Sequence, residues 1–216
     1  MKLQHIIWDW NGTLLNDRWL CVESINKTLR RRNLPTITEE KYLDIFCFPV
    51  EDYYKKLGFD FDKEPFTITG TEFIKNYNSR FQEPELHDGV IELLDFFQKR
   101  GMTQSVLSAG KLEYVNDCIF HHSLEKYFIS MLGIDNHYAG GKTDIGKAWI
   151  KKMHFSPQEC LIIGDTLHDL DVAREMGVNC VLIAQGHTSR ARLDATGAKV
   201  FENLSEFREW FSLEND

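Results

Sequence analysis

The sequence predicts an α/β protein with a Rossmann-like parallel sheet as its core and an inserted all-helical module. Three observations predict it. Short apolar runs alternate with amphipathic helical stretches along most of the chain, which is typical of βαβ units. Polar residues follow several of these runs, at the positions where a parallel sheet binds ligands. One long segment near the start has helical patterns and no convincing strand.

Five apolar runs have the length and composition of buried strands. They are residues 3–8, 103–108, 127–133, 160–165 and 179–184. Amphipathic segments between and after them predict helices over residues 88–101, 111–122, 143–153, 167–177 and 204–213. Gly101 and Gly177 close two of these segments, where glycine commonly ends a helix.

The segment of residues 18–84 differs from the rest of the chain. Helical patterns run through residues 19–32, 38–46, 51–58 and 71–81, separated by Pro35, Pro49, Pro65 and Pro84. We therefore expect a helical module over 18–84, inserted into a core of residues 1–17 and 85–216. Asp17, at the boundary, is expected to cap the first helix of the module.

Composition excludes several classes of function. With 216 residues and 43% hydrophobic content, the chain has enough material for one sizeable core and a smaller module. A formal net charge of −8 gives no basic surface for nucleic acid. The apolar runs are far shorter than a membrane span, and the first residues show no signal peptide. The five scattered cysteines form no Cys-x-x-Cys pair, which favours reduced thiols in the cytoplasm.

Polar side chains stand at the ends of the predicted strands, which a parallel sheet brings to one edge. Asp9 follows the first strand and Ser108 ends the second. Asp165 ends the fourth, and Asp169 lies one helical turn beyond it. Alone, an Asp after a strand is more often a helix cap. The arrival of all four residues at one edge indicates a site.

Carboxylates gathered in this way need a counter-charge. At about 5 Å and an effective dielectric constant of about 20, two like charges repel by roughly 3 kcal/mol. Asp9, Asp165 and Asp169 therefore either hold protons or bind a cation, and oxygen ligands in a hydrated pocket suit Mg²⁺. Lys142 or Lys147, after the third strand, would hold a phosphate. One carboxylate is then free to attack phosphorus.

Four segments resemble, in the right order, the motifs of the haloacid dehalogenase (HAD) superfamily. They are DWNGT (9–13), VLSAG (106–110), the downstream lysine and GDTLHD (164–169). The helical segment resembles the superfamily's C1-type cap, and phosphoglycolate-phosphatase-like hydrolases are the nearest subgroup. The resemblance implies a Mg²⁺-dependent phosphatase that acts on a small phosphorylated metabolite through an aspartyl phosphate, as a monomer or homodimer.

The resemblance also implies a role for each acidic-loop residue. Asp9 would be the nucleophile and a metal ligand. Asn11 would give the metal its backbone carbonyl, and Asp165 and Asp169 would complete the metal site.

Other positions are implied to bind the phosphate. Thr13 would orient the loop, and Thr13, Ser108 and Ala109 would contact the phosphate. We favour Lys142 as the phosphate lysine because it follows a Gly-Gly turn close to the third strand. Lys147, inside the predicted helix, is expected to face solvent or to support the site from outside.

Asn11 departs from the family pattern, which has an Asp there that protonates the leaving alcohol and then activates water. An amide does neither, and such acid–base assistance is worth about 10²- to 10⁴-fold. Three explanations remain open: a slow phosphatase, a leaving group that needs no proton, such as an acyl phosphate, or a substitute acid, for which His168 is the nearby candidate. Our hypothesis is that Asn11 preserves the loop and lets the aspartyl phosphate form, but slows its breakdown.

Two other classes of protein match part of the pattern. A non-catalytic or regulatory protein would bind phosphate or an effector in an inactivated pocket, and Asn11 favours that alternative. A receiver-type signalling domain also surrounds an aspartyl phosphate with acidic residues, a Ser or Thr and a Lys. A receiver domain is much shorter than this chain, however, and has no inserted helical module.

Overall fold

The structure is a computed structural model that describes residues 3–134, 141–153 and 155–215. Its centre is a six-stranded parallel sheet in the order β3-β2-β1-β4-β5-β6. The strands are β1 (His5–Trp8), β2 (Thr103–Lys111), β3 (Ser130–Ile134), β4 (Cys160–Gly164), β5 (Asn179–Ile183) and β6 (Lys199–Phe201). The α/β class and the Rossmann-like sheet are therefore confirmed. Residues 1, 2 and 216 of the expected core, and Gly140 of the Gly-Gly turn, lie outside the described residues.

The chain changes direction across the sheet between β1 and β4. Strands β2 and β3 lie on one side of β1, and β4, β5 and β6 lie on the other. In open parallel sheets this switch point opens a crevice at the carboxyl ends of the strands, where ligands bind. Asp9 and Asp165 directly follow the two strands that flank it.

Two layers of helices cover the sheet because successive residues of a strand point to opposite faces. Ile6 and Trp8 of β1 enter one core and Ile7 enters the other. The first core is covered by α5 (Val90–Lys99), α6 (Leu112–His121) and α10 (Leu204–Asn215). The second is covered by α7 (Lys142–Ile150) and α8 (Leu167–Met176).

Several short elements were not predicted from the sequence. They are the edge strand β6, the helix α9 (Arg190–Asp194) and the 3₁₀ turns η1 (Glu125–Tyr127) and η2 (Pro157–Glu159). Each has at most five residues, too few for a hydrophobic period to show. Strand β2 also runs on to Lys111, three residues past its predicted end at 108.

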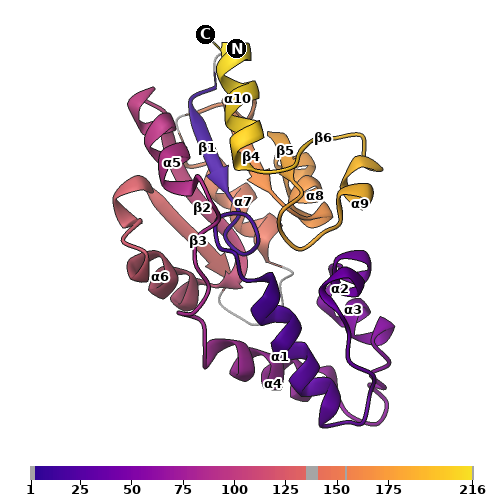
Figure 1. The fold of residues 1–216 in the computed structure, drawn as a ribbon. Helices are drawn as coiled ribbons and strands as arrows, with labels where there is room; N and C mark the ends of the chain where they lie inside the picture. The colour runs from indigo at the N-terminus through magenta and orange to yellow at the C-terminus, as the bar shows by residue number, and fades with distance from the viewer. Residues whose placement is uncertain (1–2, 135–140, 154, 216) are drawn as a thin grey trace.

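Between β1 and β2 the chain forms a separate group of helices. These are α1 (Arg18–Arg30), α2 (Glu39–Ile45), α3 (Val50–Lys56) and α4 (Phe66–Asn78). They surround a hydrophobic core of their own, in which Ile25, Tyr42 and Tyr54 are buried. The group, called the helical module below, lies beyond the carboxyl ends of the sheet strands (Figure 1).

The two connections between the core and the helical module run side by side. The Asn16 N–H donates to the Glu85 carbonyl at 2.9 Å, and the His87 N–H donates to the Leu14 carbonyl at 2.9 Å. Leu15 and Leu86 form the bridge between these two segments. The helical module is thus attached at one place, directly after the loop that carries Asp9.

The structure also describes the cysteines and the character of the helices. All five cysteines are free thiols, and three of them, Cys21, Cys118 and Cys160, are buried. Among the described residues, none of the helices has the length and apolar character needed to cross a membrane.

Candidate active site

The structure brings together the acidic residues that the sequence placed at the sheet edge. One carboxylate oxygen from each of Asp9, Asp165 and Asp169 lies within 4.8 Å of the other two. All three side chains are buried. The ammonium group of Lys142 donates to Asp9 Oδ1 and to Asp169 Oδ1, at 2.5 Å in both cases. Four charged groups therefore share one buried space at the ends of β1 and β4.

Asp165 is held by two donors, and the backbone around it is very close. Thr13 Oγ1 donates to its Oδ1 at 2.8 Å, and the His187 backbone N–H donates to its Oδ2 at 2.5 Å. A Cβ atom at Gly12 or Gly186 would stand 2.4 Å or 2.1 Å from Asp165 Oδ2. Only glycine fits at these two positions, so the loops after β1 and β5 are shaped around this carboxylate.

Asp169 lies in the first turn of α8 and takes part in capping this helix. Its Oδ2 accepts from the Thr166 N–H at 3.0 Å and from Thr166 Oγ1 at 2.7 Å, while the Thr166 hydroxyl accepts from the Asp169 N–H. This reciprocal pair is a capping box, and it fixes the carboxylate at a helix N-terminus that favours negative charge. The other carboxylate oxygen, Asp169 Oδ1, accepts the hydrogen bond from Lys142.

The charges of the cluster shift its protonation equilibria in opposite directions. Burial raises the pKa of Asp9 well above its ordinary value, although Lys142 opposes the shift. Burial also raises the pKa of Asp165, to about 6. Burial opposes ionisation of Asp169 too, but Lys142 outweighs it and the pKa of that carboxyl is lowered. The positive charge near Asp9 and Asp165 is thus too small to offset the cost of burying their carboxylates, whereas Lys142 offsets that cost for Asp169.

The phosphate-binding positions that the resemblance implied lie beside this cluster. Ser108, Ala109 and Lys142 line the same cavity as Asp9. The Ser108 hydroxyl is buried and accepts from the Gly110 N–H at 2.9 Å, which leaves its proton to donate. Lys147 lies elsewhere, on the surface of α7, where it pairs with Glu175.

Asn11 faces the helical module instead of the carboxylate cluster. Its amide Nδ2 donates to Asp17 Oδ2 at 2.8 Å and to the Tyr77 hydroxyl at 3.0 Å. The Tyr77 hydroxyl in turn donates to the same Asp17 oxygen at 2.6 Å. The amide therefore donates a hydrogen bond at a position where a carboxylate would be repelled by the negative charge of Asp17.

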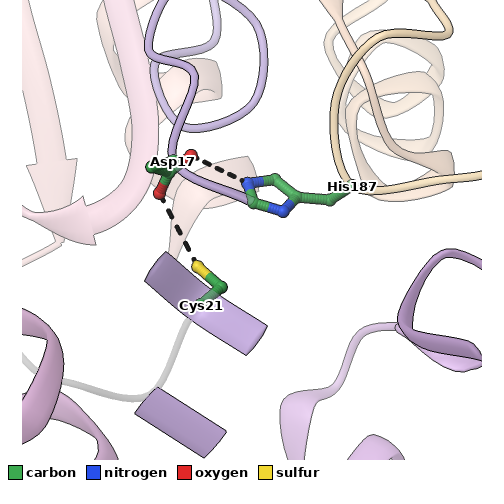
Figure 2. A group of neighbouring side chains, drawn as sticks. All are labelled: Asp17, Cys21 and His187. Atoms are coloured by element: carbon green, nitrogen blue, oxygen red, sulfur yellow. Dashed lines mark hydrogen bonds and ion pairs between the residues drawn. The ribbon is translucent and has the colours of Figure 1, made fainter. Parts of the chain in front are cut away.

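Asp17 and His187 form a second buried charged group, which the sequence did not predict. His187 Nε2 lies 3.2 Å from Asp17 Oδ1, and Cys21 Sγ lies 3.7 Å from Asp17 Oδ2 (Figure 2). The other ring nitrogen of His187 meets the Tyr42 hydroxyl at 3.0 Å. Burial alone would lower the pKa of His187, but Asp17 outweighs it and raises the pKa to about 9. The raised pKa favours the protonated ring, which makes His187 an ion-pair partner of Asp17.

The expected role of Asp17 as a helix cap was wrong. Its side chain makes no capping hydrogen bond to α1. The carboxylate turns instead to the Gly12 N–H, at 3.0 Å, and to His187, because a buried cation and donors from the loop satisfy it better than the end of one helix does. Its pKa is lowered, since the attraction of His187 and the hydrogen bonds together exceed the cost of burial.

A cavity of about 220 Å³ lies between the carboxylate cluster and the helical module. Rings from the helical module form much of its wall, among them Phe46, Phe48, Phe66 and Phe73. His168 also lines it and stacks on Phe48, with ring centroids 4.5 Å apart. The site is therefore polar on the side of the sheet and aromatic on the side of the helical module.

Comparisons with known proteins agree with this architecture. Residues 6–183 match the family model described as haloacid dehalogenase-like hydrolase. The chain is 24% identical to a 5'-nucleotidase of Pseudomonas aeruginosa, covering 90% of this chain and 89% of the relative. It is 21% identical to a phosphoglycolate phosphatase of Vibrio parahaemolyticus, covering 94% of each.

Solved structures share the fold at lower identity. A predicted phosphatase from Clostridium acetobutylicum superposes with a TM-score of 0.84 at 16% identity, over 98% of this chain and 99% of that one. The family that the sequence motifs resembled is therefore confirmed by an independent match, and the fold by structural likeness.

The Asp17–His187 pair predicts a pH-dependent stability. The pKa of His187 is raised from 6.5 to about 9 on folding, so its contribution is complete below pH 6.5 and is lost as pH rises through 9. We expect the free energy of unfolding of the unsubstituted chain to fall by on the order of 3 kcal/mol relative to that of His187→Gln across this range. Urea denaturation at a series of pH values measures it.

The control is His121→Gln, an exposed histidine at the end of α6. Its unfolding free energy is expected to follow that of the unsubstituted chain at every pH. Parallel pH profiles for the unsubstituted chain and His187→Gln would contradict the assignment of a charged His187.

Proposed function

The chain belongs to the haloacid dehalogenase-like hydrolase family, and on this premise we propose that it hydrolyses the phosphate monoester of a small metabolite, with Asp9 as nucleophile and Mg²⁺ as cofactor. The observation that carries the proposal is the meeting of Asp9, Asp165, Asp169 and Lys142 in one cavity. A phosphatase and a nucleotidase among the relatives support a reaction at phosphorus.

The donor set fits Mg²⁺. When all four groups are ionised, three carboxylates and one ammonium leave a net charge of −2, which one divalent cation balances. The donors are oxygens only, as Mg²⁺ prefers. Asp9 and Asp165 would hold the ion with the Asn11 carbonyl, and Asp169 would support them. Bound there, Mg²⁺ supplies positive charge to the phosphate and to the attacking carboxylate.

Each residue of the site has a separate role in the proposed reaction. A carboxylate oxygen of Asp9 forms a bond to phosphorus as the bond from phosphorus to the ester oxygen breaks, which gives an aspartyl phosphate and the leaving group as an anion that takes its proton from solvent water. Lys142 and the Ser108 hydroxyl hold the phosphate oxygens during this step. Water then attacks the phosphorus, releases inorganic phosphate and regenerates Asp9.

Asn11 limits the rate of both steps. Its amide neither donates a proton to the departing oxygen nor takes one from water. Its donors are also already used by Asp17 and Tyr77. His168 lines the cavity, but burial and the nearby Lys142 lower its pKa and so disfavour the protonated ring that a general acid needs. The proposed enzyme is therefore slow on esters with poor leaving groups.

The alternative of a non-catalytic phosphate-binding protein is less well supported. The nucleophile, the lysine and the acidic residues of the motifs are all retained, so nothing but Asn11 favours an inactive pocket. A receiver domain is not consistent with the family match over residues 6–183. The free cysteines support a cytoplasmic location, and the acidic net charge supports a small-molecule substrate over nucleic acid. Both a monomer and a homodimer remain compatible with the proposal.

Removal of the nucleophile tests the proposed function. With Mg²⁺ and 4-nitrophenyl phosphate, we expect turnover by the unsubstituted protein and none by Asp9→Asn, because an amide does not attack phosphorus. The matched control is Asp171→Asn, whose exposed carboxylate pairs with Arg174 on the surface of α8. Turnover that survives in a folded Asp9→Asn variant would refute the nucleophile.

Restoring a carboxyl group at position 11 tests the role of Asn11. The new carboxyl group would lie beside Asp17, which raises its pKa and lets it hold a proton for the leaving alcohol. We expect Asn11→Asp to raise turnover of alkyl phosphomonoesters by about tenfold or more, with a lower unfolding temperature. Unchanged turnover in the presence of Mg²⁺ would contradict this role.

A further inference from the structure

The cavity wall opposite the carboxylate cluster is built for an apolar group. Phe46 and Phe48 meet edge to face at 5.5 Å, and Phe46 meets Tyr53 in the same way at 5.2 Å. Phe66, Phe73 and Ile74 extend this wall along α4. With the phosphate held at the sheet edge, the part of the ester that faces the helical module would contact rings and methyl groups.

The same cavity offers no free cation to a negatively charged leaving group. The helical module contributes neither Lys nor Arg to the described residues that line it. Lys142 is shared by Asp9 and Asp169, and His187 is paired with Asp17. Lys111, partly exposed, pairs with Glu113 at 2.6 Å. A carboxylate, such as that of phosphoglycolate, would lose water there without gaining a partner.

The cavity has room for a phosphate and about one ring. An apolar cavity of roughly 150 Å³ accommodates benzene. The volume of about 220 Å³ here has to contain the phosphate as well. A phosphate with one ring beside it fits this space.

Asn11 also restricts which leaving groups depart readily, for a reason that does not involve the aromatic wall of the cavity. Without a general acid, the ester oxygen departs as an anion. Alcohols have pKa values near that of water, far above that of a phenol, which is about 10. A phenolate therefore leaves far more easily than an alkoxide when nothing protonates it.

We propose that the physiological substrate is a small aryl phosphate, in which an uncharged aromatic ring carries the phosphate on a phenolic oxygen. This inference rests on the proposed phosphatase function and names its substrate class. The aromatic wall binds the ring through edge-to-face contacts. The missing acid at position 11 is tolerated because the phenolate needs no proton to depart.

A set of four esters tests the substrate class: phenyl phosphate, benzyl phosphate, phosphoglycolate and a nucleoside 5'-monophosphate. We expect kcat/KM for phenyl phosphate to exceed that for phosphoglycolate and the nucleotide by at least about tenfold. Benzyl phosphate carries the same ring on an alkyl oxygen, so its KM is expected to match that of phenyl phosphate while its kcat is lower.

A charge placed in the aromatic wall tests the binding argument. Ile74→Lys puts an ammonium group on α4 facing the cavity, and Ile74→Gln is the matched control without charge. We expect the ratio of kcat/KM for phosphoglycolate to that for phenyl phosphate to rise about tenfold more in Ile74→Lys than in Ile74→Gln, which changes the wall without adding a charge.

The outcomes separate the two proposals. Turnover that depends on Asp9 but favours phosphoglycolate or the nucleotide would overturn the aryl substrate and leave the phosphatase function intact. Equal shifts in the two Ile74 variants would also overturn it. Absence of turnover that depends on Asp9, on all four esters, would overturn the phosphatase function itself and the substrate class with it.

Discussion

The structure depends on placing three carboxylates and one ammonium group in a buried space at the carboxyl ends of β1 and β4. Burial alone favours the neutral carboxyl, so each charge needs a local partner. Asp169 has Lys142 and the first turn of α8, and Asp165 has Thr13 and the His187 N–H. The close backbone approach at Gly12 and Gly186 follows from the same requirement. Asp9 shares Lys142 with Asp169 through its Oδ1, and its other oxygen accepts no hydrogen bond from the described residues.

A second buried pair ties the helical module to this cluster. Asp17 directly precedes α1, and His187 follows β5. His187 pairs with Asp17 through its ring and donates to Asp165 through its backbone N–H. Tyr77 of α4 and Asn11 of the acidic loop complete the contacts of Asp17. His187 therefore links the start of the helical module to the carboxylate of Asp165. In this network the amide of Asn11 has a structural role, because it donates a hydrogen bond to Asp17. This role is separate from its effect on the proposed reaction.

The sheet, its long helices and the helical module could be predicted because their patterns are long and periodic. The meeting of Asp9, Asp165, Asp169 and Lys142 followed from one rule, that parallel strands share a ligand-binding edge. The same rule pointed to the loop after β5, but a Gly-His sequence there carries no distinctive signal, and His187 was missed. Tyr42 and Tyr77 were also missed, since a helical pattern does not reveal which of its aromatic residues face a cavity. The short strand β6 had too few residues to be recognised.

The central claim is that the buried carboxylates hold one divalent cation. The most direct measurement is isothermal titration calorimetry of Mg²⁺ into the protein and into Asp165→Asn, without substrate. We expect a single Mg²⁺ site in the unsubstituted protein and its loss in the variant, because Asp165 carries charge that the cations of the chain do not fully compensate. Equal binding by both proteins, or binding by neither, would contradict it.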